Sequence, residues 1–183
     1  MKKGNRKVFY MTLTGCFAAL ITIFTAYIVH IPVGVNGGYI HFGDSLIYLA
    51  AAILPTPYAI VAAAIGGGLA DLFTAPMWTI ATVIIKSLIV LPLTSKHEKI
   101  VNVRNVIGTV IAFMISVAGY FLAEKILFGT ETAFLASVSG SIIQSGGSAV
   151  FFVILGTALD KAGIKSMVSG SKENAKEAAN INP

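Results

Sequence analysis

The segment Val35–Phe73 reads VNGGYIHFGDSLIYLAAAILPTPYAIVAAAIGGGLADLF, and it decides the fold class. It begins as a glycine-rich stretch that carries two aromatic residues, a histidine and an aspartate. It then becomes an almost uninterrupted apolar run, broken only by Pro55 and Pro57. The segment therefore predicts a polar loop that leads directly into helices buried in lipid.

The composition of the whole chain supports this interpretation. Of its 183 residues, 56% are hydrophobic and only 11% are charged, against about 25% charged residues in an ordinary soluble domain. The mean hydropathy is +0.83. A soluble protein of this size could not hide so much apolar surface in one core. We therefore predict an all-α integral membrane protein.

Six apolar runs predict six transmembrane helices with both termini in the cytoplasm. Their approximate bounds are Val8–His30, Gly43–Leu54, Tyr58–Phe73, Pro76–Leu93, Asn105–Ile126 and Phe134–Leu159. A spanning helix needs about 20 apolar residues. The first, fourth, fifth and sixth runs are long enough, whereas the second and third are short and must be tilted, broken or shielded by neighbours. Residues 1–163 form the predicted membrane domain, and residues 164–183 form a polar tail expected to be disordered.

Basic residues fix the predicted orientation. Of the 13 lysines and arginines, all but Lys86 and Lys125 lie in the N-terminal segment, in the Lys96–Arg104 connection or after Leu159. The positive-inside rule places these three regions in the cytoplasm. The net charge of +5 is then topological. It indicates no nucleic-acid partner, because the basic residues follow no binding motif.

Small residues occur where helices are expected to approach closely. The first helix carries two small-xxx-small pairs, Gly15 with Ala19 and Thr14 with Ala18. These pairs serve either packing inside the bundle or docking to a partner membrane protein. The glycines of the third helix indicate close packing, and they are Gly66, Gly67 and Gly68. Asp71 follows them, where it could cap a turn, pair with a cation or line a site.

Lys86 is the most diagnostic residue of the chain. It shares one helical face with Thr79 and Thr82 and lies roughly 13 Å from the outer end of its helix. A charge at that depth usually faces a protein interior or a watery cavity. The alternatives are an ion pair with Asp71 or Glu124, or a side chain that snorkels along its stem.

Two further polar stripes point toward the same outer half. One follows the fifth helix and the other the sixth, and their members are Ser116, Tyr120 and Glu124, and Ser137, Ser141, Gln144 and Ser148. Trp78, at the outer end of the fourth helix, is either an interfacial anchor or a stacking surface for a ring ligand. Together these residues predict an outward-opening pocket covered by the glycine-rich first loop.

Motifs for catalysis and metal binding do not occur in the sequence. There is no Walker A, HExxH, CxxC or GxSxG motif, Cys16 is the single cysteine, and the three histidines are scattered. We therefore predict no enzyme, no metal site and no cofactor. No convincing internal repeat of the kind found in secondary transporters is present either, which favours a binding subunit that borrows its energy from partners.

The layout resembles the substrate-binding S component of an energy-coupling factor (ECF) vitamin transporter. Two stretches carry the likeness, HFGDSLIYLAAAILPTPYAIVAAAIGGGLADLF and PMWTIATVIIKSLI. The resemblance implies a protein of the prokaryotic plasma membrane that binds a vitamin from outside. It also implies docking to a transmembrane T component and two ATPases, which hydrolyse the ATP, and inward delivery by toppling of the whole subunit.

The resemblance and the polar stripes together give a set of expected site residues. The expected ligand contacts are Asn36, Tyr39, His41, Trp78, Thr82, Lys86, Tyr120, Glu124, Ser141 and Gln144. The expected docking face on the first helix contains Thr14, Gly15, Ala18 and Ala19. Asp44 is expected to cap the second helix, where a carboxylate near a helix N-terminus is favourable.

The substrate remains open at this stage. A pyridoxine-like or hydroxymethylpyrimidine-like ring suits Trp78 and Tyr39 for stacking, and Gln144 and Glu124 for polar contacts. Pantothenate would instead use Lys86 as its counter-charge. The rival functions are a stand-alone small permease or channel, and a membrane assembly protein without a ligand.

Overall fold

The computed structural model describes residues 3–28, 30–32, 39–129 and 133–169, with side chains placed for 4–28, 30–31, 41–129 and 142–168. Helices dominate it. The order is α1 (Lys3–Ile23), the π-helical turn η1 (Phe24–Ile28), β1 (Ile31–Pro32), β2 (Tyr39–Ile40), α2 (Gly43–Ile53), α3 (Thr56–Thr74), the 3₁₀ turn η2 (Pro76–Trp78), α4 (Thr79–Leu88), α5 (Val103–Phe128), α6 (Ala133–Lys161) and α7 (Ile164–Ser169). α7 forms from the first six residues of the predicted tail.

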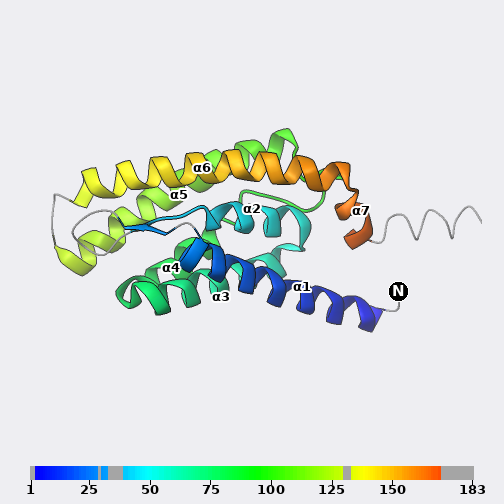
Figure 1. Cartoon of the computed structure of the whole chain (residues 1–183), viewed down its shortest axis with the longest axis horizontal. Coiled ribbons are helices and arrows are strands. Elements are labelled where there is room, and N and C mark those ends of the chain that lie inside the picture. Colours follow the sequence, from blue (N-terminus) through cyan, green and yellow to red (C-terminus); the bar gives the residue numbers. More distant parts are fainter. Residues whose placement is uncertain (1–2, 29, 33–38, 130–132, 170–183) are drawn as a thin grey trace, which may run out of the picture.

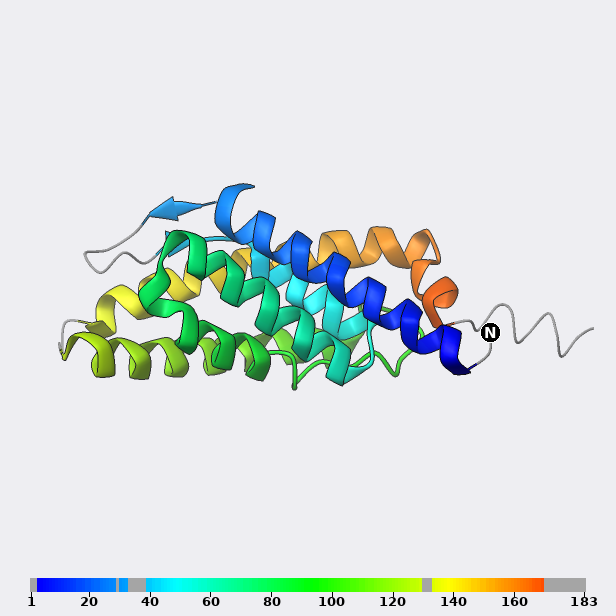
Figure 2. The same ribbon diagram turned by 90° about the horizontal axis from the view of Figure 1, so that it is seen from below.

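The helices form one elongated bundle with two distinct ends (Figure 1). α1 begins, and α7 lies, at one end, whereas the two short strands, the end of α5 and the start of α6 lie at the other. Viewed from below, α1 packs against α3 over much of the length of both helices, and α2 lies behind them (Figure 2). This confirms an all-helical membrane-type architecture, since four of the described helices are long and apolar enough to cross a membrane.

All six predicted apolar runs form helices, but two of the predicted lengths were wrong. The third run was expected to be short and the fourth long, and the structure shows the reverse. α3 has 19 residues, because Pro57 falls in its first turn, where a missing N–H costs nothing. The helix predicted at Pro76–Leu93 ends at Leu88 instead. Pro92 explains this end, since its ring would clash with the carbonyl of Leu88 if the helix continued.

α2 is the interior element of the bundle. Every residue of Gly43–Ile53 is buried, including Asp44 and Ser45. α1, α3 and α6 all pack against it. Of the three alternatives left open for the short second helix, the described residues show shielding by its neighbours.

The three glycines of α3 face its two neighbours. A Cβ at Gly66 would lie 2.7 Å from Ile21 Cβ and 2.8 Å from the carbonyl oxygen of Ala18 on α1. A Cβ at Gly67 would lie 2.9 Å from the Lys86 stem on α4, and one at Gly68 would lie 2.7 Å from Val83. Each glycine therefore permits an approach that a larger residue would prevent.

The small residues of α1 divide between two faces. Thr14 and Ala18 are buried, and Ala18 meets α3 through its carbonyl oxygen. Gly15 and Ala19 are exposed, and a Cβ at Gly15 would meet no atom within 4 Å. Of the four residues expected on one docking face, Thr14 and Ala18 therefore serve packing inside the bundle, because a helix with small residues all round can turn only one pair of them outward.

A short antiparallel hairpin anchors the first loop. Ile31 pairs with Ile40, and Pro32 pairs with Tyr39. The glycine-rich residues 33–38 between the strands, including Asn36, lie outside the described residues. Before the hairpin, η1 brings Thr25 so close to the start of α2 that a Cβ at Gly43 would overlap its hydroxyl oxygen.

Side-chain hydrogen bonds fix the α4–α5 connection at the opposite end. Asp160 of α6 accepts from the backbone N–H groups of Ile100 and Val101, at 2.7 and 3.0 Å. Asn105 of α5 accepts from the N–H of Thr94 and donates to its carbonyl, and it donates a further bond to Ile100. The connection, the start of α1 and α7 lie at the same end (Figure 1), so the basic residues that they carry gather there.

We expect Gly66→Ala to destabilise the bundle by about 1–3 kcal/mol, the usual cost of overpacking. Its new Cβ would press on Ile21 and on the backbone of α1, which must shift. Thermal unfolding of the purified protein in detergent measures the effect. Gly146→Ala on α6 is the matched control, because a Cβ there meets nothing within 4 Å. Equal stability of the two variants would contradict the role of Gly66.

Candidate functional site

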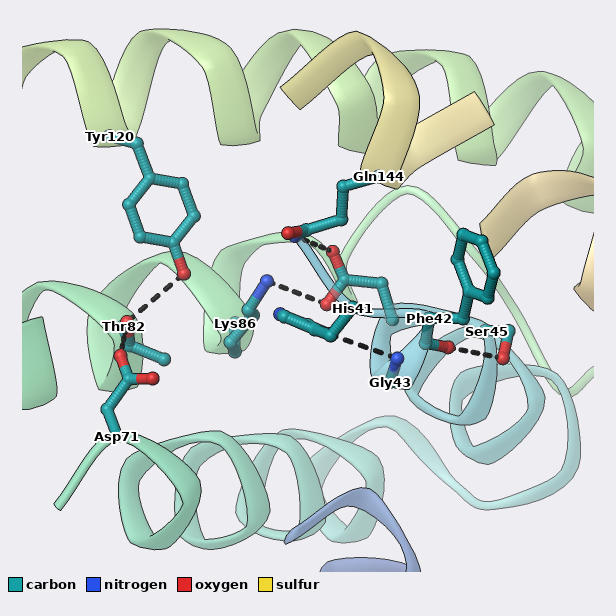
Figure 3. A network of polar contacts seen from close by, with 10 residues as sticks. His41, Phe42, Gly43, Ser45, Asp71, Thr82, Lys86, Tyr120 and Gln144 are labelled. Atoms are coloured by element: carbon teal, nitrogen blue, oxygen red, sulfur yellow. Dashed lines mark hydrogen bonds and ion pairs between the residues drawn. The ribbon is translucent and has the colours of Figure 1, made fainter. Parts of the chain in front are cut away.

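Polar side chains from five helices meet inside the apolar bundle (Figure 3), close to the start of α2, which follows the hairpin in the chain. α2, α3, α4, α5 and α6 each contribute at least one of them, and the residues are Asp44, Asp71, Thr82, Lys86, Tyr120 and Gln144. We call this set the polar cluster. Of the described α-helices, only α1 and α7 contribute no residue to it.

A buried ion pair forms the first arm of the polar cluster. The ammonium nitrogen of Lys86 lies 2.6 Å from one carboxylate oxygen of Asp44, and the two side chains are 1% and 0% exposed. Gln144 donates from its amide nitrogen to the other oxygen of Asp44, at 3.1 Å. α4, α2 and α6 are thus tied through one carboxylate. A buried charge is tolerated when it is paired and hydrogen-bonded in this way.

A chain of hydroxyls forms the second arm. Thr82 donates to the carboxylate of Asp71, and its oxygen lies 3.1 Å from the hydroxyl of Tyr120. This arm links α3, α4 and α5. The two arms touch, because Lys86 lies one helical turn after Thr82 and its ammonium nitrogen is 5.3 Å from the centre of the Tyr120 ring.

His41 closes the polar cluster on the side of the hairpin. Its Nδ1 accepts from the backbone N–H of Gly43 at 3.0 Å, and the side chain is buried. His41 thus satisfies one of the free N–H groups at the start of α2. Asp44 was expected to fill this role, but its carboxylate turns to Lys86 and Gln144 instead.

Aromatic rings enclose the second arm. Trp78 packs edge-on against Tyr120 at 6.1 Å and against Phe128 at 5.7 Å between ring centroids. The Trp78 side chain is buried. The alternative of an interfacial anchor fails for this residue, because an anchor must expose its ring to the headgroup region. Glu124, one turn after Tyr120, is also buried.

The structure brings together half of the ligand contacts expected from the sequence and places others beside them. His41, Thr82, Lys86, Tyr120 and Gln144 lie in or against the polar cluster. Trp78 of η2 packs against Tyr120, and Glu124 of α5 is buried one turn beyond Tyr120. Ser116 and Ser148 are buried as well, so the fifth-helix stripe and the described members of the sixth-helix stripe, Gln144 and Ser148, are directed inward. Asn36 lies outside the described residues, as do the side chains of Tyr39 and Ser141.

Sequence reasoning missed the partner of Lys86. Asp71 and Glu124 were the expected partners, yet the ion pair forms with Asp44. The available signal was that Asp44 is the single acidic or basic residue of a mostly apolar stretch, Gly43–Leu54. A carboxylate inside a helix that is buried on all sides requires a counter-charge more strongly than one near a helix end.

The chemistry of the polar cluster is that of binding. Among the described residues, no group of three histidine, cysteine or acidic side chains is placed to hold a metal ion. The polar cluster presents one ammonium, two carboxylates, an amide and two hydroxyls, all supplied by rigid helices. Such a set can orient a small polar ligand through hydrogen bonds in a water-poor site.

Comparison with known proteins agrees with this picture. Residues 5–161 match the family described as "ECF-type riboflavin transporter, S component". The chain belongs to this S-component family. It is also 30% identical over 131 residues to a Pyrococcus woesei protein named "Uncharacterized protein in gap 3'region". The aligned region covers 67% of this chain and 88% of that protein. The S-component family is a transporter family, which fits an apolar helical bundle with a polar interior site.

We expect Asp44→Asn and Lys86→Gln each to destabilise this S component by about 3–5 kcal/mol, since each leaves one buried charge unpaired. The double variant Asp44→Asn/Lys86→Gln should lose much less than the sum of the two. Chemical or thermal unfolding in detergent micelles gives the three free energies of unfolding. Additive losses would show that the two charges do not stabilise each other.

Proposed function

We propose that this chain is the high-affinity vitamin-binding subunit of an ECF-type ABC importer, which captures a small ring compound from outside. The observation that carries the proposal is the polar cluster, which five helices hold inside an apolar bundle of the S-component family. Buried polar and charged groups are costly inside a membrane, and they usually mark a functional site. A ligand that hydrogen-bonds to them accounts for their presence.

The proposed orientation follows from charge. The basic end of the bundle faces the cytoplasm, with both chain termini, and the hairpin end faces outward in a prokaryotic plasma membrane. All six apolar helices then cross or line the membrane, including the two shorter ones, α2 and Pro76–Leu88. α2 suits this role despite its length because it is enclosed by protein.

The proposed ligand site comprises the polar cluster with Trp78, and the first loop is its cover. Asn36, Tyr39, His41 and Ser141 belong to this proposed site by their place in the sequence. The name of the matching family makes riboflavin the first ligand to test. Pyridoxine-like and hydroxymethylpyrimidine-like rings are the next, since the aromatic rings of Trp78 and Tyr120 favour planar compounds in general.

The proposed partners are a T component and two ATPase subunits, which would supply the energy. The chain itself needs no cofactor in this scheme. The exposed Gly15 and Ala19 on α1 support docking, because nothing within the described bundle covers Gly15. Docking through small residues lets two membrane helices approach closely.

A vitamin should stabilise the purified protein against heat. A ligand at 100 times its dissociation constant stabilises a protein by about 2.7 kcal/mol. A thermal-shift screen with riboflavin, pyridoxine, hydroxymethylpyrimidine and pantothenate measures this in detergent. No shift with any vitamin would contradict the proposal. Uptake into liposomes without any ATPase would support the rival permease instead.

Docking can be separated from ligand binding by one substitution. We expect Gly15→Leu to retain vitamin binding but to lose co-purification with the T component, because its side chain would hold the two helices apart. Gly146→Leu is the matched control, since Gly146 is an exposed glycine on α6 with equal free space. Equal recovery of the T component with both variants would place the docking surface elsewhere.

A further inference from the structure

The charge balance of the polar cluster indicates the class of ligand. Lys86 is its one ammonium group, and Asp44 already occupies that group at 2.6 Å. Asp71 accepts a hydrogen bond from Thr82, which lies one helical turn before Lys86 on α4, and Glu124 is buried one turn beyond Tyr120. The polar cluster and its immediate surroundings therefore hold more carboxylates than ammonium groups.

The rest of the outer half of the chain does not change this balance. Between the predicted end of the first helix and Lys86, the sequence contains His30 and His41 but no arginine and no other lysine. After Arg104 and before Lys161, the only basic residue is Lys125, which is exposed. Lys165 is also buried, but it donates to the carbonyl of Lys99 beside the α4–α5 connection, so among the described residues Lys86 is the only permanent cation in the polar cluster.

We propose that Asp44 makes the site selective for uncharged ring compounds and against anionic ones, by occupying the one cation that the polar cluster holds among the described residues. An anionic ligand near Lys86 would be attracted by the ammonium and repelled by the carboxylate of Asp44 beside it. The second carboxylate of the polar cluster, Asp71, would repel it as well, and it would lose its hydration on entry. In such a poorly solvated site, one unfavourable unit charge a few ångströms away weakens binding on the order of a hundredfold.

This inference rests on the proposed function, and it changes one part of the sequence-based expectation. Lys86 alone was a counter-charge for pantothenate. In the structure, Lys86 is paired with Asp44, and Gln144 holds Asp44 in place. Lys86 can therefore bind an anionic ligand only if that ligand displaces the carboxylate of Asp44. Lys86 and Gln144 then act on an uncharged ligand as hydrogen-bond donors.

Matched ligand pairs test the inference directly on the full chain in detergent. Riboflavin is compared with riboflavin 5′-phosphate, and pyridoxine with 4-pyridoxate, in which a carboxylate replaces a hydroxymethyl group. Isothermal titration calorimetry gives each dissociation constant. We expect the uncharged member of whichever pair binds to be tighter by about a hundredfold. Equal affinity within that pair would overturn the inference.

Two variants distinguish charge from size. Asp44→Asn frees Lys86, so the preference for the uncharged member should fall at least about tenfold. Lys86→Gln leaves Asp44 uncompensated, so the preference should rise. The control Glu98→Gln removes a carboxylate from the exposed α4–α5 connection and should leave the preference unchanged. An unchanged preference in a folded Asp44→Asn protein would mean that size decides, and would overturn the role of Asp44.

The outcomes separate this inference from the proposed function. If no vitamin binds the wild-type chain, the proposed function fails and the inference fails with it. If riboflavin or pyridoxine binds but charge has no effect, only the inference fails. If Asp44→Asn does not fold, the test is whether Lys86→Gln raises the preference for the uncharged ligand. If neither variant folds, the affinities of the wild-type chain for each matched ligand pair decide alone.

Discussion

The contact between the ammonium of Lys86 and the carboxylate of Asp44 constrains the whole bundle. Each charge would cost at least about 2.5–3.5 kcal/mol alone at the centre of a membrane helix. The pair forms only if α2 lies inside the bundle, with α4 turned toward it. α2 is buried along its full length, and Gln144 on α6 must then reach the free oxygen of the same carboxylate. One electrostatic requirement thus fixes the relative rotation of three helices.

Close packing along α3 makes this geometry possible. Gly67 lets the aliphatic stem of Lys86 lie against α3, while Gly66 receives the backbone of α1 on another face. A larger residue at either position would move α4 or α1 outward. The ammonium of Lys86 would then lose its short contact with α2. The glycines that a helix in water would avoid therefore support the ion pair, and they turn Gly15 and Ala19 of α1 away from the bundle.

Hydropathy alone located the helices, whereas contacts between helices could not be read from it. The apolar runs were clear, so all six were found. The boundary errors include the start of α1, which begins at Lys3 rather than Val8, and the positions where Pro57 and Pro92 set a boundary. The rotation of each helix was harder, because α1 and α6 are apolar on most sides and give little preference for one face. That is why Thr14 and Ala18 could not be told from Gly15 and Ala19. The partner of Lys86 was missed for a related reason: three carboxylates were available, and the choice among them depends on which helix lies inside.

The placement of the polar cluster also bears on how a ligand would travel inward. Between the polar cluster and the basic end, the interior is filled by large apolar side chains, among them Ile47, Leu54, Ile89, Ile100 and Phe152. Beyond them, Asp160 and Asn105 fix the α4–α5 connection across the end of the bundle. A channel through this region would have to separate α2 from its neighbours and break the buried ion pair. Movement of the whole bundle keeps those contacts intact, since the charges stay paired while the site changes sides. Under the proposed function, the packing of the described bundle therefore argues for movement as a rigid body, as the family resemblance implies, over the opening of a pore.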